Sequence, residues 1–251
     1  MFRKIPCIRI DGSRRKPSEC NAAEEMVLAL FVNGRHTMTA TVSPGGLREF
    51  AAGYLFTEQI IAGAGEIESI REETNRISVL TTNPFRTAGA KKTVLSGCGG
   101  STSYIDTAKL PIIPPGFSLS AAAVTGFMEE AIPRATGRIH TAALADAGGI
   151  VTRAEDIGRH NALDRVIGHG VLSGVDFETT CALCSGVISS EMVRKCLAAR
   201  IPVIASRADA TTLAADIARK TGLCVIGCVS GGGMAVYANP ERLNGSTPSP
   251  E

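Results

Sequence analysis

The sequence predicts an α/β protein, with a small amino-terminal α+β domain followed by a layered α/β domain. Three observations support this: an asparagine–glycine hairpin pattern early in the chain, a proline-rich segment at residues 110–116, and regular alternation of strand and helix patterns after residue 180. The chain has 251 residues, of which 44% are hydrophobic, which is enough for two domains with real cores. We therefore expect domains at residues 1–115 and 116–251.

In the first domain, apolar patterns predict a small sheet with one helix packed on it. Asn33 and Gly34 separate two such patterns, and this pair favours the positive φ angles of a type I′ turn. Apolar residues then recur at helical spacing after Pro44, which suits a helix entry. We expect strands at residues 5–11, 26–32, 35–42 and 76–81, and a helix at residues 44–59.

In the second domain, strands and helices alternate at a spacing that requires parallel crossover connections. Ser120 is placed to cap the first helix. Ligands in such sheets bind beyond the carboxyl ends of the strands. We expect helices at 120–131, 189–199 and 211–220, a strand pair at 140–146 and 150–152, and strands at 180–184, 202–206, 223–229 and 234–238.

Composition excludes several classes of function. The formal net charge of +2 gives no bulk attraction to nucleic acid. No apolar run is long enough to cross a membrane, and none is placed as a signal peptide. The eight cysteines are scattered among apolar residues rather than spaced as a disulfide scaffold. We therefore expect a cytoplasmic protein in a reducing setting that binds neither nucleic acid nor membrane.

The loop that reads KKTVLSGCGGS carries the first candidate site residue, Cys98. Glycines on both sides leave its sulfur unshielded, and successive backbone N–H groups can stabilise a thiolate. Lys91 and Lys92 are close in sequence and favour the same ionised form. The alternative is a tight turn in which the cysteine is merely a small residue.

The stretch EDIGRHNALDRVIG, residues 155–168, combines an acidic pair, a polar cluster and a short amphipathic helix. Glu155 and Asp156 precede that helix, where its amino end favours negative charge. Arg159, His160 and Asn161 lie in the first turn and can donate to an anion or to a purine edge. The alternative is a capped helix with a solvated polar turn.

Several long motifs, in order, resemble one family. They are VNGRHTMTATVSPGGLREFAAGYLFTEQII, TGRIHTAAL, EDIGRHNALDRVIG and SSEMVRK, together with an ending that runs from IPVIAS through TGLCVIGCVSGGGMAVYANPERL. With these the chain resembles the formate dehydrogenase accessory sulfurtransferases, the FdhD family, over about residues 24–243.

The resemblance implies a carboxy-terminal three-layer domain of cytidine-deaminase-like fold, and a homodimer. It implies a sulfurtransferase that takes persulfide sulfur from a cysteine desulfurase. The sulfur passes to the molybdenum cofactor, bis-molybdopterin guanine dinucleotide, which is bound as substrate before it enters the formate dehydrogenase apoenzyme. The persulfide-bearing residue corresponds to Cys98. The cofactor-binding segment corresponds to Cys228, Val229, Ser230, Gly231, Gly232 and Gly233, and no side-chain metal ligand is implied.

The chain departs from the family pattern, which keeps two alternatives open. Ser101 stands where the family has a second cysteine, so a pathway between two thiols is in doubt, and a non-catalytic cofactor-binding chaperone is the first alternative. The second is a zinc-dependent hydrolase of deaminase type that uses His140, Cys181 and Cys184. Ala142 occupies the place of its catalytic glutamate. Val187 and the run Asp209-Ala210-Thr211 also depart from the family pattern.

Overall fold

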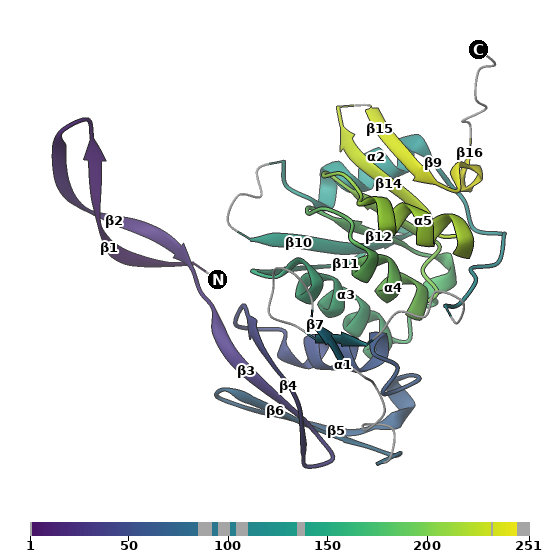
Figure 1. Cartoon of the computed structure of the whole chain (residues 1–251), viewed down its shortest axis with the longest axis horizontal. Coiled ribbons are helices and arrows are strands. Elements are labelled where there is room, and N and C mark those ends of the chain that lie inside the picture. The colour runs from purple at the N-terminus through teal and green to yellow at the C-terminus, as the bar shows by residue number, and fades with distance from the viewer. Residues whose placement is uncertain are drawn as a thin grey trace.

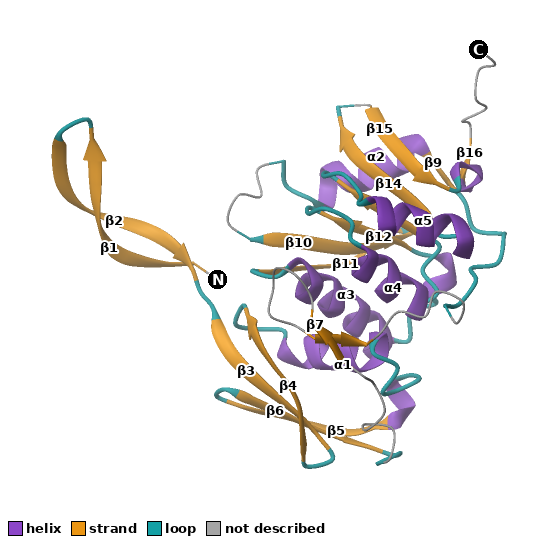
Figure 2. Ribbon diagram, in the orientation of Figure 1, coloured by secondary structure: helices purple, strands orange, loops and turns teal. Residues whose placement is uncertain are grey.

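The computed structural model describes residues 2–84, 92–94, 101–103, 110–134, 139–231 and 233–244. Its two largest described sheets have four and six strands, and helices lie between them (Figure 1; Figure 2). This mixed architecture confirms the predicted α/β class. None of the described helices is long and apolar enough to cross a membrane.

The four-stranded sheet has the order β4-β3-β6-β5. Asn33 and Gly34 have φ angles of 49° and 77°, and Val32 pairs directly with Arg35, so the predicted hairpin is confirmed. Strand β5 was not predicted, because its sequence IESIREE is mostly charged and mostly exposed. The strands are β3 (Met26–Val32), β4 (Arg35–Val42), β5 (Ile67–Glu73) and β6 (Arg76–Thr81).

Helix α1 (Leu47–Thr57) covers one face of this sheet. It begins three residues later than predicted, because Gly45 and Gly46 have φ angles of 86° and 58°, which an α-helix cannot include. Phe50 and Leu55 on its buried face pack with apolar residues of β3 and β6. The amphipathic spacing read from the sequence therefore identifies the correct face.

The six-stranded sheet has the order β11-β10-β12-β13-β14-β15. Its strands β12, β13 and β14 are parallel and are joined through helices, which confirms the predicted crossovers. Strands β10 and β15 run antiparallel to their neighbours. The strands are β10 (His140–Asp146), β11 (Gly149–Asp156), β12 (Cys181–Cys184), β13 (Val203–Ser206), β14 (Cys224–Ser230) and β15 (Gly233–Ala238).

Helices cover both faces of the six-stranded sheet and make three layers. Ala143 and Ala145 of β10 pack in the cluster with α2, while Ala142 and Leu144 pack in the cluster with the other three helices. This alternation follows from the two-residue period of a strand. The helices are α2 (Ala121–Ala131) on one face, and α3 (Arg159–Ser173), α4 (Ser190–Ala198) and α5 (Thr212–Thr221) on the other.

The two large sheets are joined by a close crossing of α1 and α3. A Cβ atom built on Gly53 would lie 1.8 Å from the carbonyl oxygen of Asp164, and one built on Gly168 would lie 1.8 Å from that of Glu49. Backbone therefore meets backbone at this crossing. Only glycine at both positions permits this distance.

The proline-rich segment predicted as a linker is fixed to the carboxy-terminal sheet and its helices. Ile113 is buried, and its N–H donates to Thr221 at the end of α5 over 2.8 Å. The guanidinium of Arg242 donates to the carbonyls of Ile113, Pro114 and Phe117.

The other described elements are short. They are β7 (Lys92–Val94), β8 (Ser101–Ser103), β9 (Leu119–Ser120), β16 (Leu243–Asn244) and the 3-10 turns Ala64–Glu66, Phe177–Thr179 and Pro240–Arg242.

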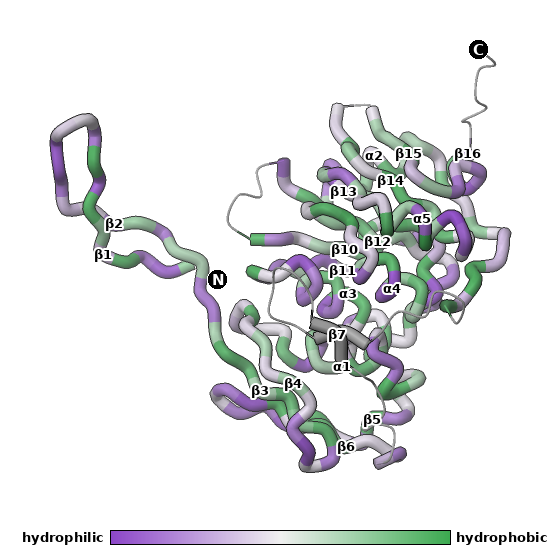
Figure 3. The backbone as a smooth tube through the Cα atoms, viewed as in Figure 1, coloured by the Kyte–Doolittle hydropathy of each residue, from purple (hydrophilic) through white to green (hydrophobic). Residues whose placement is uncertain are grey.

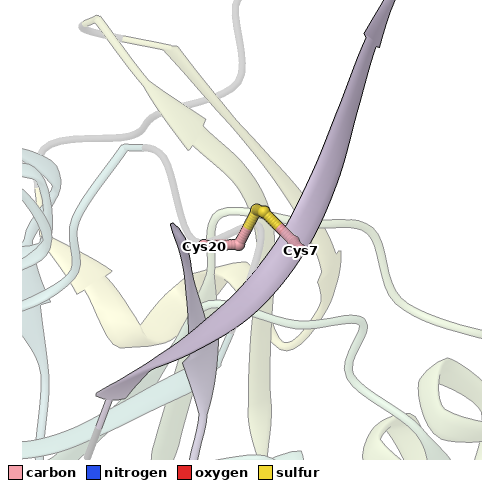
Figure 4. The surroundings of a disulfide bond; sticks show 2 residues. All are labelled: Cys7 and Cys20. Carbon is pink, nitrogen blue, oxygen red and sulfur yellow. A yellow bond between two sulfur atoms is a disulfide. The ribbon is translucent and has the colours of Figure 1, made fainter. Parts of the chain in front are cut away.

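The first strands form an arm that projects from the rest of the protein (Figure 1; Figure 3). Strand β1 (Phe2–Asp11) pairs with β2 (Arg14–Ala23) in a two-stranded antiparallel sheet. Strand β2 was not predicted, because its sequence is polar and contains a proline. Cys7 and Cys20 form a disulfide across the arm, with Cα atoms 6.0 Å apart (Figure 4). This pair was not predicted from the sequence, because the spacing of the cysteines shows no disulfide pattern.

Candidate functional site

The predicted sulfur-bearing residue, Cys98, lies outside the described residues, as does Gly232. The remaining residues of the predicted cofactor segment form the end of β14, the turn after it and the start of β15. Ser230 pairs with Gly233 across that turn, and Gly231 has a φ of 49°. Val229 is buried, and its carbonyl accepts a hydrogen bond from Arg207 over 3.2 Å.

Cys228 is the exposed thiol of this segment and has an unusual backbone φ of 55°. Its sulfur lies 2.7 Å from Oδ1 of Asp209 and 3.8 Å from the hydroxyl of Tyr237. The hydrogen bond to Asp209 raises the pKa of the thiol, while the one to Tyr237 lowers it. Because the thiolate is the nucleophile, the thiol form of Cys228 is a poor acceptor for sulfur.

Replacing Asp209 by asparagine is expected to increase alkylation of Cys228 by iodoacetamide severalfold at neutral pH. The substitution removes the carboxylate that raises the pKa of the thiol, so the thiolate fraction increases. The measurement is the labelling rate of the Cys228 peptide by mass spectrometry. Tyr237→Phe is the matched control and should slow labelling, because Tyr237 lowers the same pKa; equal rates in both variants would contradict the assignment.

Asp156 is the last residue of β11. Its carboxylate is buried and hydrogen-bonded, and does not lie in solvent before the helix. Its carboxylate accepts hydrogen bonds from the backbone N–H of Ser43 over 3.0 Å and of Gly158 over 2.8 Å. It also accepts from Asn161 over 2.9 Å and from Arg165, whose nearest nitrogen is 2.7 Å away. The side-chain amide of Asn161 therefore helps to hold this part of the chain in place.

A second buried network joins α1, α3 and α4. Lys195 Nζ lies 2.9 Å and 2.8 Å from the two carboxylate oxygens of Asp164, and it donates to the hydroxyl of Thr57 over 3.1 Å. Arg194, the next residue along α4, pairs with Glu58. These residues were not identified from the sequence. The signal that could have found them is a charged residue at a position that the amphipathic pattern assigns to the buried face of a helix.

Polar residues at the starts of α3, α4 and strand β10 form what we call the helix-start cluster: His140, Arg159, His160, Ser189 and Glu191. His160 Nε2 lies 3.2 Å from the hydroxyl of Ser189 and 3.3 Å from a carboxylate oxygen of Glu191. Strand β10 begins at His140, opposite the end of β11 and beside the end of β12, so the cluster lies at the carboxyl edge of the parallel strands.

Electrostatic surroundings keep both histidines of the cluster neutral. Burial, then Lys195 and Arg159, lowers the pKa of His160 to about 3. Burial and Arg159 also lower the pKa of His140. Burial raises the pKa of Glu191. The permanent positive charge within the cluster is therefore Arg159.

The zinc site considered from sequence is wrong, because its two cysteines face opposite sides of the sheet. Cys181 packs in the cluster with α2, and Cys184 packs in the cluster with α3 and α4. Burial raises the pKa of both thiols, that of Cys184 to about 11. Across the described residues, no group of three His, Cys, Asp or Glu side chains is arranged to hold a metal ion.

The chain is similar to known proteins over most of its length. The model of the FdhD/NarQ family matches residues 23–244. The Sulfur carrier protein FdhD of Variovorax paradoxus is 34% identical, over 89% of this chain and 86% of that protein. The protein of the same name from Methanothermobacter thermautotrophicus is 30% identical, over 97% of this chain and 99% of its own length.

A solved structure agrees with these relatives. The crystal structure of a candidate formate dehydrogenase accessory protein from Desulfotalea psychrophila superimposes with a TM-score of 0.80 and 25% sequence identity, covering 96% of this chain and 99% of that one. Fold and sequence therefore agree over nearly the whole chain. The chain belongs to the FdhD/NarQ family.

Proposed function

We propose that this chain carries sulfur as a persulfide on Cys98. The sulfur comes from a cysteine desulfurase and passes to the bis-molybdopterin guanine dinucleotide form of the molybdenum cofactor before that cofactor enters formate dehydrogenase. The observation that carries the proposal is the family match over residues 23–244, together with a cysteine that lies between two glycines at position 98. The names of the relatives, sulfur carrier and accessory protein, support it.

The proposed reaction begins with thiol–disulfide chemistry. The Cys98 thiolate attacks the outer sulfur of the donor's persulfide, the donor's S–S bond breaks, and the donor cysteine leaves as a thiolate. Release of that sulfur as sulfide takes two electrons. Ser101 has no thiol to supply them. A small thiol therefore attacks Sγ of Cys98, the S–S bond of the persulfide breaks, sulfide leaves, and a mixed disulfide forms between Cys98 and the small thiol. A second small thiol then breaks that disulfide, frees the Cys98 thiolate and leaves joined to the first small thiol. The protein acts in the cytoplasm as a homodimer, and residues 228–233 contact the cofactor.

The test is intact-mass measurement and peptide mapping after incubation with a cysteine desulfurase and cysteine. The expected result is added sulfur on Cys98, lost completely in Cys98→Ala and kept in Ser101→Ala and Cys228→Ala. The Cys98→Ala variant should also fail to support formate dehydrogenase activity. Full support of that activity by Cys98→Ala would overturn the proposal.

A cofactor-binding chaperone that moves no sulfur is the second candidate, and Ser101 in place of a second cysteine is the observation that favours it. It predicts that guanine nucleotide binding and formate dehydrogenase activation both survive Cys98→Ala. The sulfur carrier predicts that binding survives and activation is lost. The two candidates are therefore separated by one variant with two readouts.

A further inference from the structure

We infer that the cysteine pair of the arm, when reduced, is a second site of sulfur chemistry. It takes the outer sulfur of a persulfide and releases it as sulfide, and the Cys7–Cys20 disulfide is the product. The inference rests on the proposed function for the source of the persulfide. That function needs two electrons for each sulfide released, and Ser101 cannot supply them. Two thiols that close into one disulfide supply that number of electrons.

The Cys7–Cys20 disulfide joins β1 to β2 within the arm. No residue of these two strands belongs to the three apolar clusters that form the cores of the large sheets. The disulfide therefore lies outside the packing that holds the rest of the protein together. It can open and close while that packing stays intact, and a redox-active pair requires this freedom.

Both sulfur atoms lie where reagents can reach them. Cys7 and Cys20 are part-exposed, and no residue of β1 or β2 is buried. The arm projects away from the two large sheets (Figure 1; Figure 4). By contrast, four of the five free cysteines in the described part of the chain are buried. Exposed disulfides exchange with thiols more readily than buried structural ones, so the exposure of this pair favours a reactive role.

The register of the arm places the two cysteines side by side. Cys7 is opposite Ser18 and Cys20 is opposite Ile5, so the cysteines are diagonal neighbours on one face of the ribbon. Their Cα atoms are 6.0 Å apart, which a disulfide spans without movement of the backbone. Once Cys7 has accepted sulfur, Cys20 is therefore already in place to attack it, and this second step is intramolecular.

The face of the arm that carries the cysteines is positively charged. Arg9 is the next residue after Cys7 on this face and is opposite Lys16, and Arg3 lies on the other side of the cysteine pair. Asp11 is the carboxylate of this face and lies beside the turn. The surrounding positive charge stabilises thiolates, and the thiolate is the form of cysteine that exchanges sulfur.

The reaction takes two exchange steps. The Cys7 thiolate attacks the outer sulfur of a persulfide R–S–SH, its S–S bond breaks, R–S⁻ leaves, and Cys7 carries –S–SH. The Cys20 thiolate then attacks Sγ of Cys7, that S–S bond breaks, HS⁻ leaves, and the disulfide closes. The released sulfur gains two electrons and the two thiols lose them. Two small thiols then reopen the arm disulfide and become a disulfide themselves.

The test uses the full chain and glutathione persulfide under anaerobic conditions. A Cys98→Ala chain whose arm has been reduced, and from which the reductant has been removed, should release one sulfide per chain and close its arm disulfide. The same chain with the arm still oxidised is the matched control and should release sulfide about tenfold more slowly or less. Sulfide is measured by trapping with bromobimane, and the disulfide by peptide mapping without reduction.

Adding Cys20→Ser to the Cys98→Ala chain should stop the reaction after its first step and leave added sulfur on Cys7. This variant should melt at the same temperature as its parent with the arm reduced, because the arm lies outside the cores. Lost chemistry is thereby separated from lost folding. Equal rates of sulfide release from the reduced, the oxidised and the Cys20→Ser chains would overturn the site and leave the disulfide as a brace for the arm.

The persulfide has two candidate sources, Cys98 of this protein and small persulfides. After loading by a cysteine desulfurase and cysteine, a chain with both Cys7→Ser and Cys20→Ser should retain more sulfur on Cys98 than wild type. Equal retention, with sulfide release by the Cys98→Ala chain intact, would identify small persulfides as the substrate of the arm. Absence of sulfur on Cys98 in both chains, with that release intact, would overturn the proposed function alone.

Discussion

Replacing Gly168 by alanine should destabilise the protein by about 3 kcal/mol or more, although alanine is the better helix former by about 1 kcal/mol. The added methyl group would lie 1.8 Å from the carbonyl oxygen of Glu49 and 2.7 Å from the backbone nitrogen of Gly53. Both atoms belong to the backbone of α1, so no side chain can move aside. Helices α1 and α3 must separate, which opens the packing between the two large sheets. The measurement is the free energy of unfolding in urea.

Gly126→Ala in α2 is the matched control. Gly126 is an exposed helical glycine with no atom within 4 Å of the added methyl group, so alanine should stabilise that helix by about 1 kcal/mol. The two glycine substitutions are thus expected to change stability in opposite directions. A Gly168→Ala protein as stable as wild type would show that the helices do not cross at this distance.

Replacing Lys195 by methionine should cost about 3–5 kcal/mol, because it leaves the Asp164 carboxylate buried without its partner. Both side chains are almost completely buried, with exposed fractions of 2% and 3%. Adding Asp164→Leu should recover most of the loss, since an apolar pair replaces the buried ions. Arg219→Met breaks an exposed pair with Asp216 on α5 and should cost about 0.5 kcal/mol or less.

The Lys195→Met defect should shrink as the pH falls from about 7 to 5. Burial raises the pKa of Asp164 in the folded wild type, and Lys195 opposes that shift. Without the lysine the folded-state pKa rises further above the unfolded value, so the folded variant binds a proton that the unfolded chain does not. Acid therefore favours the folded variant. Urea unfolding at both pH values measures this, and a defect that grows in acid would contradict the assignment.

Local patterns predicted the elements that depend on local chemistry. The turn at Asn33 and Gly34 and the parallel strands β12 to β14 follow from turn chemistry and from apolar periodicity. Strand β2 does not, because its pairing with β1 holds together a polar sequence that has no buried face. Alternating apolar and polar residues indicate a strand with one buried face, and the strands of the exposed arm have no buried face.

The candidate site was predictable only in part, because its contacts join distant residues. Ser43 and Asp156 are 113 residues apart, and Lys195 and Asp164 are 31 apart. The residues of the signature stretch at positions 155–168 divide into two roles. Asp156, Asn161 and Arg165 hold the fold, while Arg159 has no partner among the described residues. Sequence spacing cannot show which charged side chain is paired in the folded protein and which is not.

Four free cysteines are buried, and this makes it possible to trace where sulfur is added to the folded chain. They are Cys181, Cys184, Cys196 and Cys224. These thiols are closed to solvent, and burial raises the pKa of each. Neither a persulfide donor nor an alkylating reagent reaches them without unfolding. A brief native labelling step followed by denaturation and a second, isotopically distinct label would separate the chain's thiols into two populations. Isotope ratios then assign any persulfide to Cys98, to Cys228 or to an opened arm disulfide.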